Sequence, residues 1–226
     1  MTVQLAPTQA TIPIRTGYRC VKRAIDVVFT LLILLPLCIL VVTIAIAIRL
    51  DSQGPIFFRQ RRMGRNGVEF DMLKFRSMND NCDDTPHRQA IEQYMADRPL
   101  GKLSGEAQFQ YKLVDDARVT RVGRVLRKTS LDEFPQFFNV LRGEMTLVGP
   151  RPALPYEVDL YGPRDRLRLC SKPGLTGPWQ VYGRSRVPFS SMIEMDLAYL
   201  RRQSLWEDIK LIALTVPIMI RGQGGM

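Results

Sequence analysis

The strongest constraint on the fold is an uncharged apolar run near the start of the chain, at residues 27–48. As one helix this run would be about 33 Å long, close to the thickness of the hydrocarbon core of a bilayer. A buried helix of a soluble protein is one alternative, but few soluble cores contain so long a run without a polar face. A cleaved signal peptide is another, but the basic leader and the run are both too long for one. The run therefore predicts a membrane element.

The residues in and around this run favour an element that enters the membrane and returns. Basic residues flank both ends: Arg19, Lys22 and Arg23 before it, and Arg49, Arg59, Arg61 and Arg62 after it. Positive flanks favour the cytoplasmic side, and Pro36 inside the run should bend the helix. We expect a re-entrant membrane helix over 19–50 that forms a hairpin, with Asp26 pairing with Arg23 at headgroup level. A kinked helix that crosses the membrane is the alternative.

The sequence after the run has the composition of a soluble domain. Residues 56–62 and 68–76 are typical of two strands, and the Asn-Gly pair in the GRNG segment at 64–67 predicts a tight hairpin turn between them. Residues 204–220 are typical of a helix with a wide apolar face. The expected fold class is α+β and mostly helical, with a re-entrant membrane helix and a compact domain that contains a small β-hairpin.

We expect the chain to consist of three segments, the last of which contains one insertion. Residues 1–18 form an N-terminal tail, 19–50 the membrane helix and 51–221 a cytoplasmic domain. Within that domain, 79–117 contains four basic and eight acidic residues, a net charge of −4, although the whole chain carries +10. This composition indicates a surface insertion, with a short helix at about 86–96.

Composition also limits the chemistry. The chain contains a single histidine, His87, in a polar stretch, which disfavours a Ser-His-Asp or Cys-His mechanism. Its four cysteines, Cys20, Cys38, Cys82 and Cys170, form no CxxC pair, so a zinc site is disfavoured and unpaired thiols are expected. Acid–base or nucleophilic chemistry would therefore use carboxylates. The positive net charge suits nucleic acid, an anionic membrane or a phosphorylated substrate.

The best candidates are the adjacent acids Asp132 and Glu133. They precede a helical pattern that Gly143 should end, and Ser130 with Glu133 has the spacing of a capping box. Acids in a first helical turn often do no more than complement the helix dipole. These two lie within 118–151, however, where seven basic residues face three acidic ones. Carboxylates among arginines suit a site for phosphates and a divalent metal.

Several ordered motifs resemble one known family, the bacterial sugar transferases, also called small monotopic phosphoglycosyl transferases. They are KRAID at 22–26, FFRQRRMGRNG at 57–67, KFRSM at 74–78, the segment from RVTRVGR to LVGPRP at 118–152, and KPGLTGPWQVYGRS at 172–185. The resemblance extends over about residues 19–221 and departs from the family at 79–117. No Walker-type or GxGxxG loop is present, and Trp179 could stack on a base or simply pack in its loop.

The resemblance implies a mechanism. Asp132 would attack the sugar-linked phosphate of a UDP-sugar, UMP would leave, and a polyprenol phosphate would take the phosphosugar from the aspartate. Asp132 and Glu133 would hold Mg²⁺. The substrate-binding positions, which would contact phosphates or order the site, are Lys74, Arg76, Arg127 and Arg151.

The resemblance also implies a location and a role. The catalytic domain would rest on the cytoplasmic face of the bacterial inner membrane and start a surface polysaccharide or glycan on undecaprenyl phosphate. No nucleic acid is expected as a partner, and the apolar elements would allow a homo-oligomer. The alternative is a membrane-tethered basic protein that binds nucleic acid or anionic lipid without catalysis. That alternative explains the charge and the apolar run, but not the acid pair inside a basic stretch.

Overall fold

The computed structural model describes residues 16–79, 85–97, 101–103, 106–108, 118–183 and 187–220. The α-helices are α1 (Thr16–Asp51), α2 (Thr85–Met95), α3 (Arg121–Thr129), α4 (Gln136–Arg142), α5 (Pro155–Asp159), α6 (Phe189–Arg202) and α7 (Leu205–Ile220). The strands are β1 (Phe57–Met63), β2 (Glu69–Phe75), β3 (Gly101–Leu103), β4 (Glu106–Gln108), β5 (Thr146–Val148) and β6 (Gly174–Thr176). Short segments of other helix types are η1 (Arg65–Gly67), η2 (Leu131–Glu133), η3 (Asp165–Cys170) and η4 (Trp179–Gly183). The expected mostly helical fold with small sheets is confirmed.

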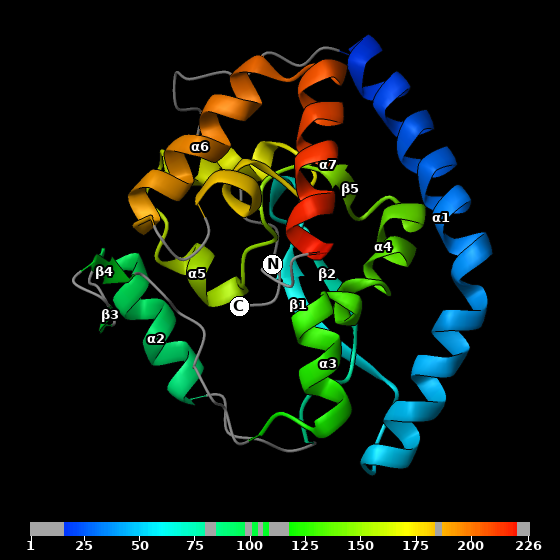
Figure 1. Cartoon of the computed structure of the whole chain (residues 1–226). Helices are drawn as coiled ribbons and strands as arrows, with labels where there is room; N and C mark the ends of the chain where they lie inside the picture. Colours follow the sequence, from blue (N-terminus) through cyan, green and yellow to red (C-terminus); the bar gives the residue numbers. More distant parts are fainter. Residues whose placement is uncertain are drawn as a thin grey trace.

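Helix α1 is one continuous helix of 36 residues that runs through Pro36. Figure 1 shows it bent near its middle, so that both ends approach the rest of the domain. The helix contains no turn that would reverse the chain direction as in a hairpin, and its path in a membrane stays a prediction. The helix begins at Thr16, three residues before the predicted boundary at 19, and the rest of the predicted tail lies outside the described residues.

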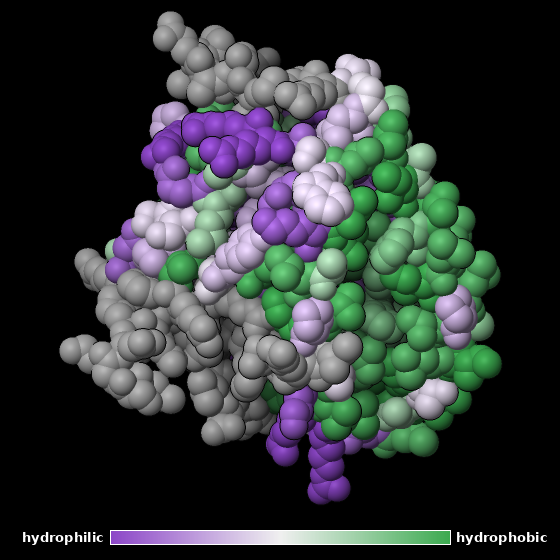
Figure 2. Space-filling view, turned by 45° about the horizontal axis from the view of Figure 1, so that its top comes forward, coloured by the Kyte–Doolittle hydropathy of each residue, from purple (hydrophilic) through white to green (hydrophobic). Residues whose placement is uncertain are grey.

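The middle of α1 carries an apolar surface that the domain does not cover. Its exposed side chains include Leu32, Leu35 and Ile39, which are 65%, 70% and 76% exposed. Figure 2 shows hydrophobic side chains over the side of the molecule where α1 lies, with hydrophilic ones gathered elsewhere. Trp206, 75% exposed on α7, adds a large aromatic group to the accessible apolar surface. Exposure on this scale is typical of a surface that contacts a membrane or another protein.

The predicted β-hairpin is confirmed. Strands β1 and β2 pair antiparallel from Phe57 opposite Phe75 to Met63 opposite Glu69. Asn66 and Gly67 both take positive φ, at 58° and 75°, as the Asn-Gly signal requires.

A second, parallel pair joins β5 to β6, with Thr146 opposite Gly174. Here the two Pro-Gly segments pass so closely that a Cβ on Gly174 would lie 2.1 Å from the backbone nitrogen of Gly149. Only glycine permits this approach, and it fixes the loop that carries Arg151.

The core is formed largely by α6 together with the elements around the β-hairpin of β1 and β2. Helix α2 contributes to it through Ala90, Ile91 and Tyr94, which are 6%, 2% and 3% exposed and pack toward α5 and α6. The predicted helix at about 86–96 is therefore present, and one of its faces belongs to the core. The acidic composition of 79–117 did not indicate this apolar face, and the surface insertion stays a prediction. The remaining parts of the segment lie largely outside the described residues.

Candidate functional site

The acid pair lies in the turn η2, between α3 and α4. Ser130 ends α3 in the left-handed conformation, with φ of 58°, which is uncommon for a residue other than glycine. The backbone N–H of Glu133 then donates to the carbonyl of Ser130 at 3.2 Å. The predicted capping box is wrong, because the Ser130 side chain makes no capping bond and the Glu133 carboxylate points to another partner. The predicted end at Gly143 is confirmed by its φ of 81°.

The structure brings one predicted basic residue directly to the pair. Lys74, near the end of β2, donates from Nζ to Oε1 of Glu133 at 3.0 Å. The two side chains are 22% and 40% exposed, so the ion pair remains open to solvent and to a ligand. Asp132 and Glu133 are both half-buried. An ammonium bonded to one of two adjacent, accessible acidic residues suits a site where a phosphate must approach an aspartate oxygen.

Asn139 fixes the distance between α4 and β2. The sequence did not single out this residue. Fully buried on α4, it donates from Nδ2 to the carbonyl of Asp71 at 2.8 Å and accepts from the backbone N–H of Leu73 at 3.0 Å. It also donates to Glu144 Oε2 at 2.6 Å. The helix after the acid pair is thus fastened to the strand that carries Lys74. A polar residue inside the apolar stretch FPQFFNVL was the signal that could have revealed it.

Helix α3 is seated on the extension of β2 by a close contact. A Cβ on Gly123 would lie 2.1 Å from the carbonyl oxygen of Ser77, so this position needs a residue without a side chain. Arg127 lies half-buried in the last turn of α3, five residues before Asp132. Its guanidinium makes no hydrogen bond or ion pair with the residues that the structure describes. It is therefore the candidate cation that remains available to an anionic substrate.

Arg76 has a different environment from the one expected of a phosphate-binding residue. It is 4% exposed and donates to the backbone oxygen of Ser52 at 2.7 Å and to its hydroxyl at 2.9 Å. A weaker bond reaches the carbonyl of Ile48 at 3.5 Å. A cation at the carbonyl end of a helix is favourable, so Arg76 fixes the end of α1. Of the two roles considered for it, the contacts support ordering the site.

Arg151 lies in the Pro-Arg-Pro loop, with its guanidinium 5.4 Å from the centre of the Trp179 ring. Trp179 is only 7% exposed and belongs to the core, so packing rather than base stacking explains it. The loop is held at two backbone oxygens. Arg62 donates to the carbonyl of Pro152 at 2.8 Å, and Arg168, itself paired with Asp196 at 2.6 Å, donates to the carbonyl of Arg151 at 3.1 Å.

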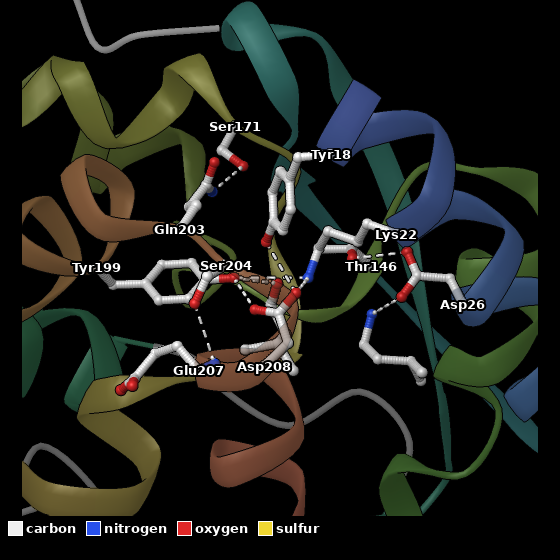
Figure 3. A network of polar contacts seen from close by, with 12 residues as sticks. Tyr18, Lys22, Asp26, Thr146, Ser171, Tyr199, Gln203, Ser204, Glu207 and Asp208 are labelled. Atoms are coloured by element: carbon white, nitrogen blue, oxygen red, sulfur yellow. Dashed lines mark hydrogen bonds and ion pairs between the residues drawn. The ribbon is translucent and has the colours of Figure 1, made fainter. Parts of the chain in front are cut away.

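A buried polar network joins the start of α1 to α6 and α7 (Figure 3). Asp208 accepts from Tyr18 at 2.8 Å, from Lys22 at 2.6 Å and from Tyr199 at 2.6 Å. Burial raises the pKa of both phenols, so they stay protonated and donate. Lys22 was expected to anchor α1 near the membrane surface, but its partner is this carboxylate.

The expected pair between Arg23 and Asp26 is wrong. Asp26 is 4% exposed and accepts from the Thr146 hydroxyl at 2.7 Å and from the backbone N–H of Leu147 at 3.1 Å. Arg23 instead donates to carbonyls of α4. The KRAID motif therefore docks α1 onto the domain, and the helical spacing by itself could not show this.

The two acids have the donor set that a hard divalent cation prefers. Within the parts of the chain that the structure describes, no three His, Cys, Asp or Glu side chains converge on one point. Mg²⁺ does not require such a cluster, because it is usually bound by one or two carboxylates together with substrate phosphates and water. Asp132 and Glu133, half-buried and adjacent, fit that requirement. Three of the four cysteines are described, and Cys20, Cys38 and Cys170 are free thiols, as expected.

The chain matches a known protein family over most of its length. Residues 17–222 match the family model described as bacterial sugar transferase. The chain is 38% identical over 203 residues to the exopolysaccharide production protein ExoY of Sinorhizobium fredii, covering 90% of this chain and 87% of that protein.

Two longer relatives match only in part. The chain is 40% identical to the galactosyl transferase CpsE of Streptococcus agalactiae, over 90% of this chain and 43% of that protein. It is 38% identical to the undecaprenyl-phosphate galactose phosphotransferase of Salmonella typhimurium, over 91% of this chain and 42% of that protein. It thus spans less than half of these two relatives. The family match nevertheless includes α3, the acid pair and α4. The chain belongs to the bacterial sugar transferase family.

Proposed function

We propose that the protein transfers a sugar 1-phosphate from a UDP-sugar to undecaprenyl phosphate and releases UMP. The observation that carries the proposal is the half-exposed pair Asp132 and Glu133, in which Glu133 is bonded to Lys74. Arg127, five residues before Asp132, makes no ion pair with the described residues. The names of relatives supply the substrate class. They include the undecaprenyl-phosphate galactose phosphotransferase, and a UDP-glucose:undecaprenyl-phosphate glucose-1-phosphate transferase of Xanthomonas campestris that is 39% identical.

The reaction has two displacements at the same phosphorus. In the first, an Asp132 carboxylate oxygen attacks the sugar-linked phosphorus, the bond to the bridging oxygen breaks, and UMP leaves with that electron pair. In the second, a phosphate oxygen of the lipid attacks the phosphorus of the phosphosugar-aspartate, and the Asp132 carboxylate leaves. Dividing the transfer in this way is covalent catalysis. Lys74 and Arg127 stabilise negative charge on the phosphates and hold them beside the nucleophile.

Glu133 and Asp132 would hold Mg²⁺, which neutralises charge on the donor diphosphate when bound. Lys74 orients the Glu133 carboxylate by their hydrogen bond. We expect turnover to stop in EDTA and to return with Mg²⁺. Undiminished turnover under rigorous chelation would contradict this role.

The acceptor requires access to a membrane. The exposed apolar middle of α1 is the only helix segment of the described residues that is long and apolar enough for a bilayer. We propose that α1 enters the inner membrane from the cytoplasmic face and returns, so that the domain rests on that face. The lipid phosphate then reaches Asp132 without leaving the headgroup layer. In this position the enzyme would start a surface polysaccharide on its lipid carrier.

The test replaces the nucleophile and follows both products. Asp132→Asn should abolish UMP release from UDP-sugars in the presence of undecaprenyl phosphate and Mg²⁺. Intact-mass analysis of the wild type with donor alone should show a phosphosugar adduct on Asp132. Asp159→Asn, an exposed aspartate on α5, serves as the matched control and should keep full activity. An adduct on another residue, or an active Asp132→Asn, would refute the assignment. Absence of UMP release from every donor would favour a non-catalytic protein.

A further inference from the structure

Helix α1 contacts the elements on both sides of the acid pair, and the first contact lies at its C-terminal end. The Asp51 carboxylate accepts the backbone N–H of Val122, in the first turn of α3, at 2.9 Å. A carboxylate at a helix N-terminus satisfies an unpaired donor and complements the helix dipole. This hydrogen bond lowers the pKa of Asp51, which therefore stays ionised. The last residue of the membrane helix thus holds the start of the helix that leads to Asp132.

The second contact lies in the first third of α1. Arg23 donates from its two terminal nitrogens to the carbonyls of Val140, at 2.5 Å, and Leu141, at 2.7 Å. These carbonyls belong to the last turn of α4, where a cation is favourable. The helix that leaves the acid pair is therefore held by the same membrane helix, at a point 28 positions before Asp51.

The third contact lies under the acid pair itself. Leu131 and Phe134, the residues immediately before and after Asp132 and Glu133, pack on an apolar cluster. That cluster contains Ile44 and Ile48 of α1 together with Phe75 and Leu126. Ile48 is 2% exposed, so this part of α1 is enclosed by the domain and not by lipid. The residues that flank the acid pair thus pack on a cluster to which α1 contributes Ile44 and Ile48.

We propose that α1 sets the position of the acid pair, with Asp51 and Arg23 as its positioning residues. The three contacts fix the start of α3, the turn η2 and the end of α4 relative to one helix. A shift of α1 in the membrane must therefore move Asp132 relative to the phosphates. This inference rests on the proposed function, because its consequence is measured at the nucleophile. A misplacement of about 1 Å in a reacting group can reduce a rate by about 10²-fold.

The experiment measures the rate and the extent of adduct formation separately. Asp51→Ala removes the bond to α3, whereas Asp51→Asn keeps an acceptor oxygen at the same place. Each protein, reconstituted in phosphatidylglycerol vesicles, is mixed with donor alone, and the phosphosugar adduct is followed by rapid quench and intact mass. Arg49→Ala is the matched control, because Arg49 lies in the same last turns of α1 but donates to the carbonyl of Gly54.

We expect Asp51→Ala to form the adduct about 10- to 100-fold more slowly than the wild type but to the same final extent. Asp51→Asn should recover most of the rate, and Arg49→Ala should match the wild type. A purely structural role would lower the final extent and leave the rate of the active fraction unchanged, which would overturn the proposal. A wild-type rate in Asp51→Ala would overturn it as well, and would leave the proposed function intact. Absence of an adduct from the wild type would refute the proposed function and this inference together.

Discussion

Removing the Asp208 carboxylate should destabilise the protein strongly, because it is the common acceptor for one buried donor, Tyr199, and two half-buried donors, Tyr18 and Lys22. Asp208→Ala leaves the Lys22 ammonium, whose side chain is only 12% exposed, without its 2.6 Å partner. Breaking a buried pair on one side costs about 3–5 kcal/mol. At about 2–4 °C per kcal/mol for a chain of this size, the Tm should fall by about 6–20 °C.

A second variant separates the charge from the packing. Lys22→Met with Asp208→Leu removes both charges and keeps apolar volume, and such replacements are often close to neutral. The hydroxyl of Tyr199 retains an acceptor in that variant, since the carbonyl of Val148 lies 3.2 Å away. The double variant should therefore recover at least half of the lost Tm, measured by thermal unfolding in detergent with Asp159→Ala as the control. A shift below about 2 °C for Asp208→Ala, or a double variant no more stable than the single one, would refute the reasoning.

Three further predictions concern the site and its support. Gly123→Ala should lower the free energy of unfolding by about 1–3 kcal/mol and slow adduct formation, because its Cβ would lie 2.1 Å from the oxygen of Ser77. Gly17→Ala, with nothing within 4 Å, is its control and should not lower either quantity. Lys74→Gln should reduce kcat by about 10²-fold or more while changing stability by about 1 kcal/mol or less, since its ion pair is partly exposed. A loss of kcat that is explained by the unfolded fraction of the variant would contradict this. The lowered pKa of Asp51 means that its stabilising effect is complete above the unfolded value of about 3.9 and is lost as the pH falls through the lower folded value. The Tm difference between wild type and Asp51→Ala should therefore shrink below about pH 4, and a constant difference down to pH 3 would argue against it.

The sequence predicted those elements well whose formation depends on neighbouring residues alone. The Asn-Gly turn, the strands around it and the stop at Gly143 depend on backbone preferences of a few residues, and each is present. The capping box of Ser130 failed because a distant lysine, Lys74, offered Glu133 a charged partner. Helix α2 was predicted, but its buried face was not, because that face is recognisable only when α5 and α6 are in place.

The candidate site was predictable in position but not in arrangement. Adjacent acids in a basic stretch pointed to Asp132 and Glu133, and the motif pointed to Lys74, which the structure places beside them. The same reasoning left two roles open for Arg76, contacting a phosphate or ordering the site, and its bonds to Ser52 at the end of α1 support the second. Charge alone cannot distinguish the two roles, because a guanidinium suits a phosphate and a helix carbonyl equally well.

By itself the sequence determined a long apolar helix with basic flanks, a hairpin and an acid pair near arginines, because these depend on composition and short-range spacing. Only the tertiary structure decided what the charges of that helix do. Arg23, Asp26 and Asp51 were available for lipid headgroups as far as the sequence could tell, yet each binds a backbone group far along the chain. The physical reason is that a charged side chain takes the partner that folding brings within about 3 Å, and folding brings together residues that no sequence spacing connects.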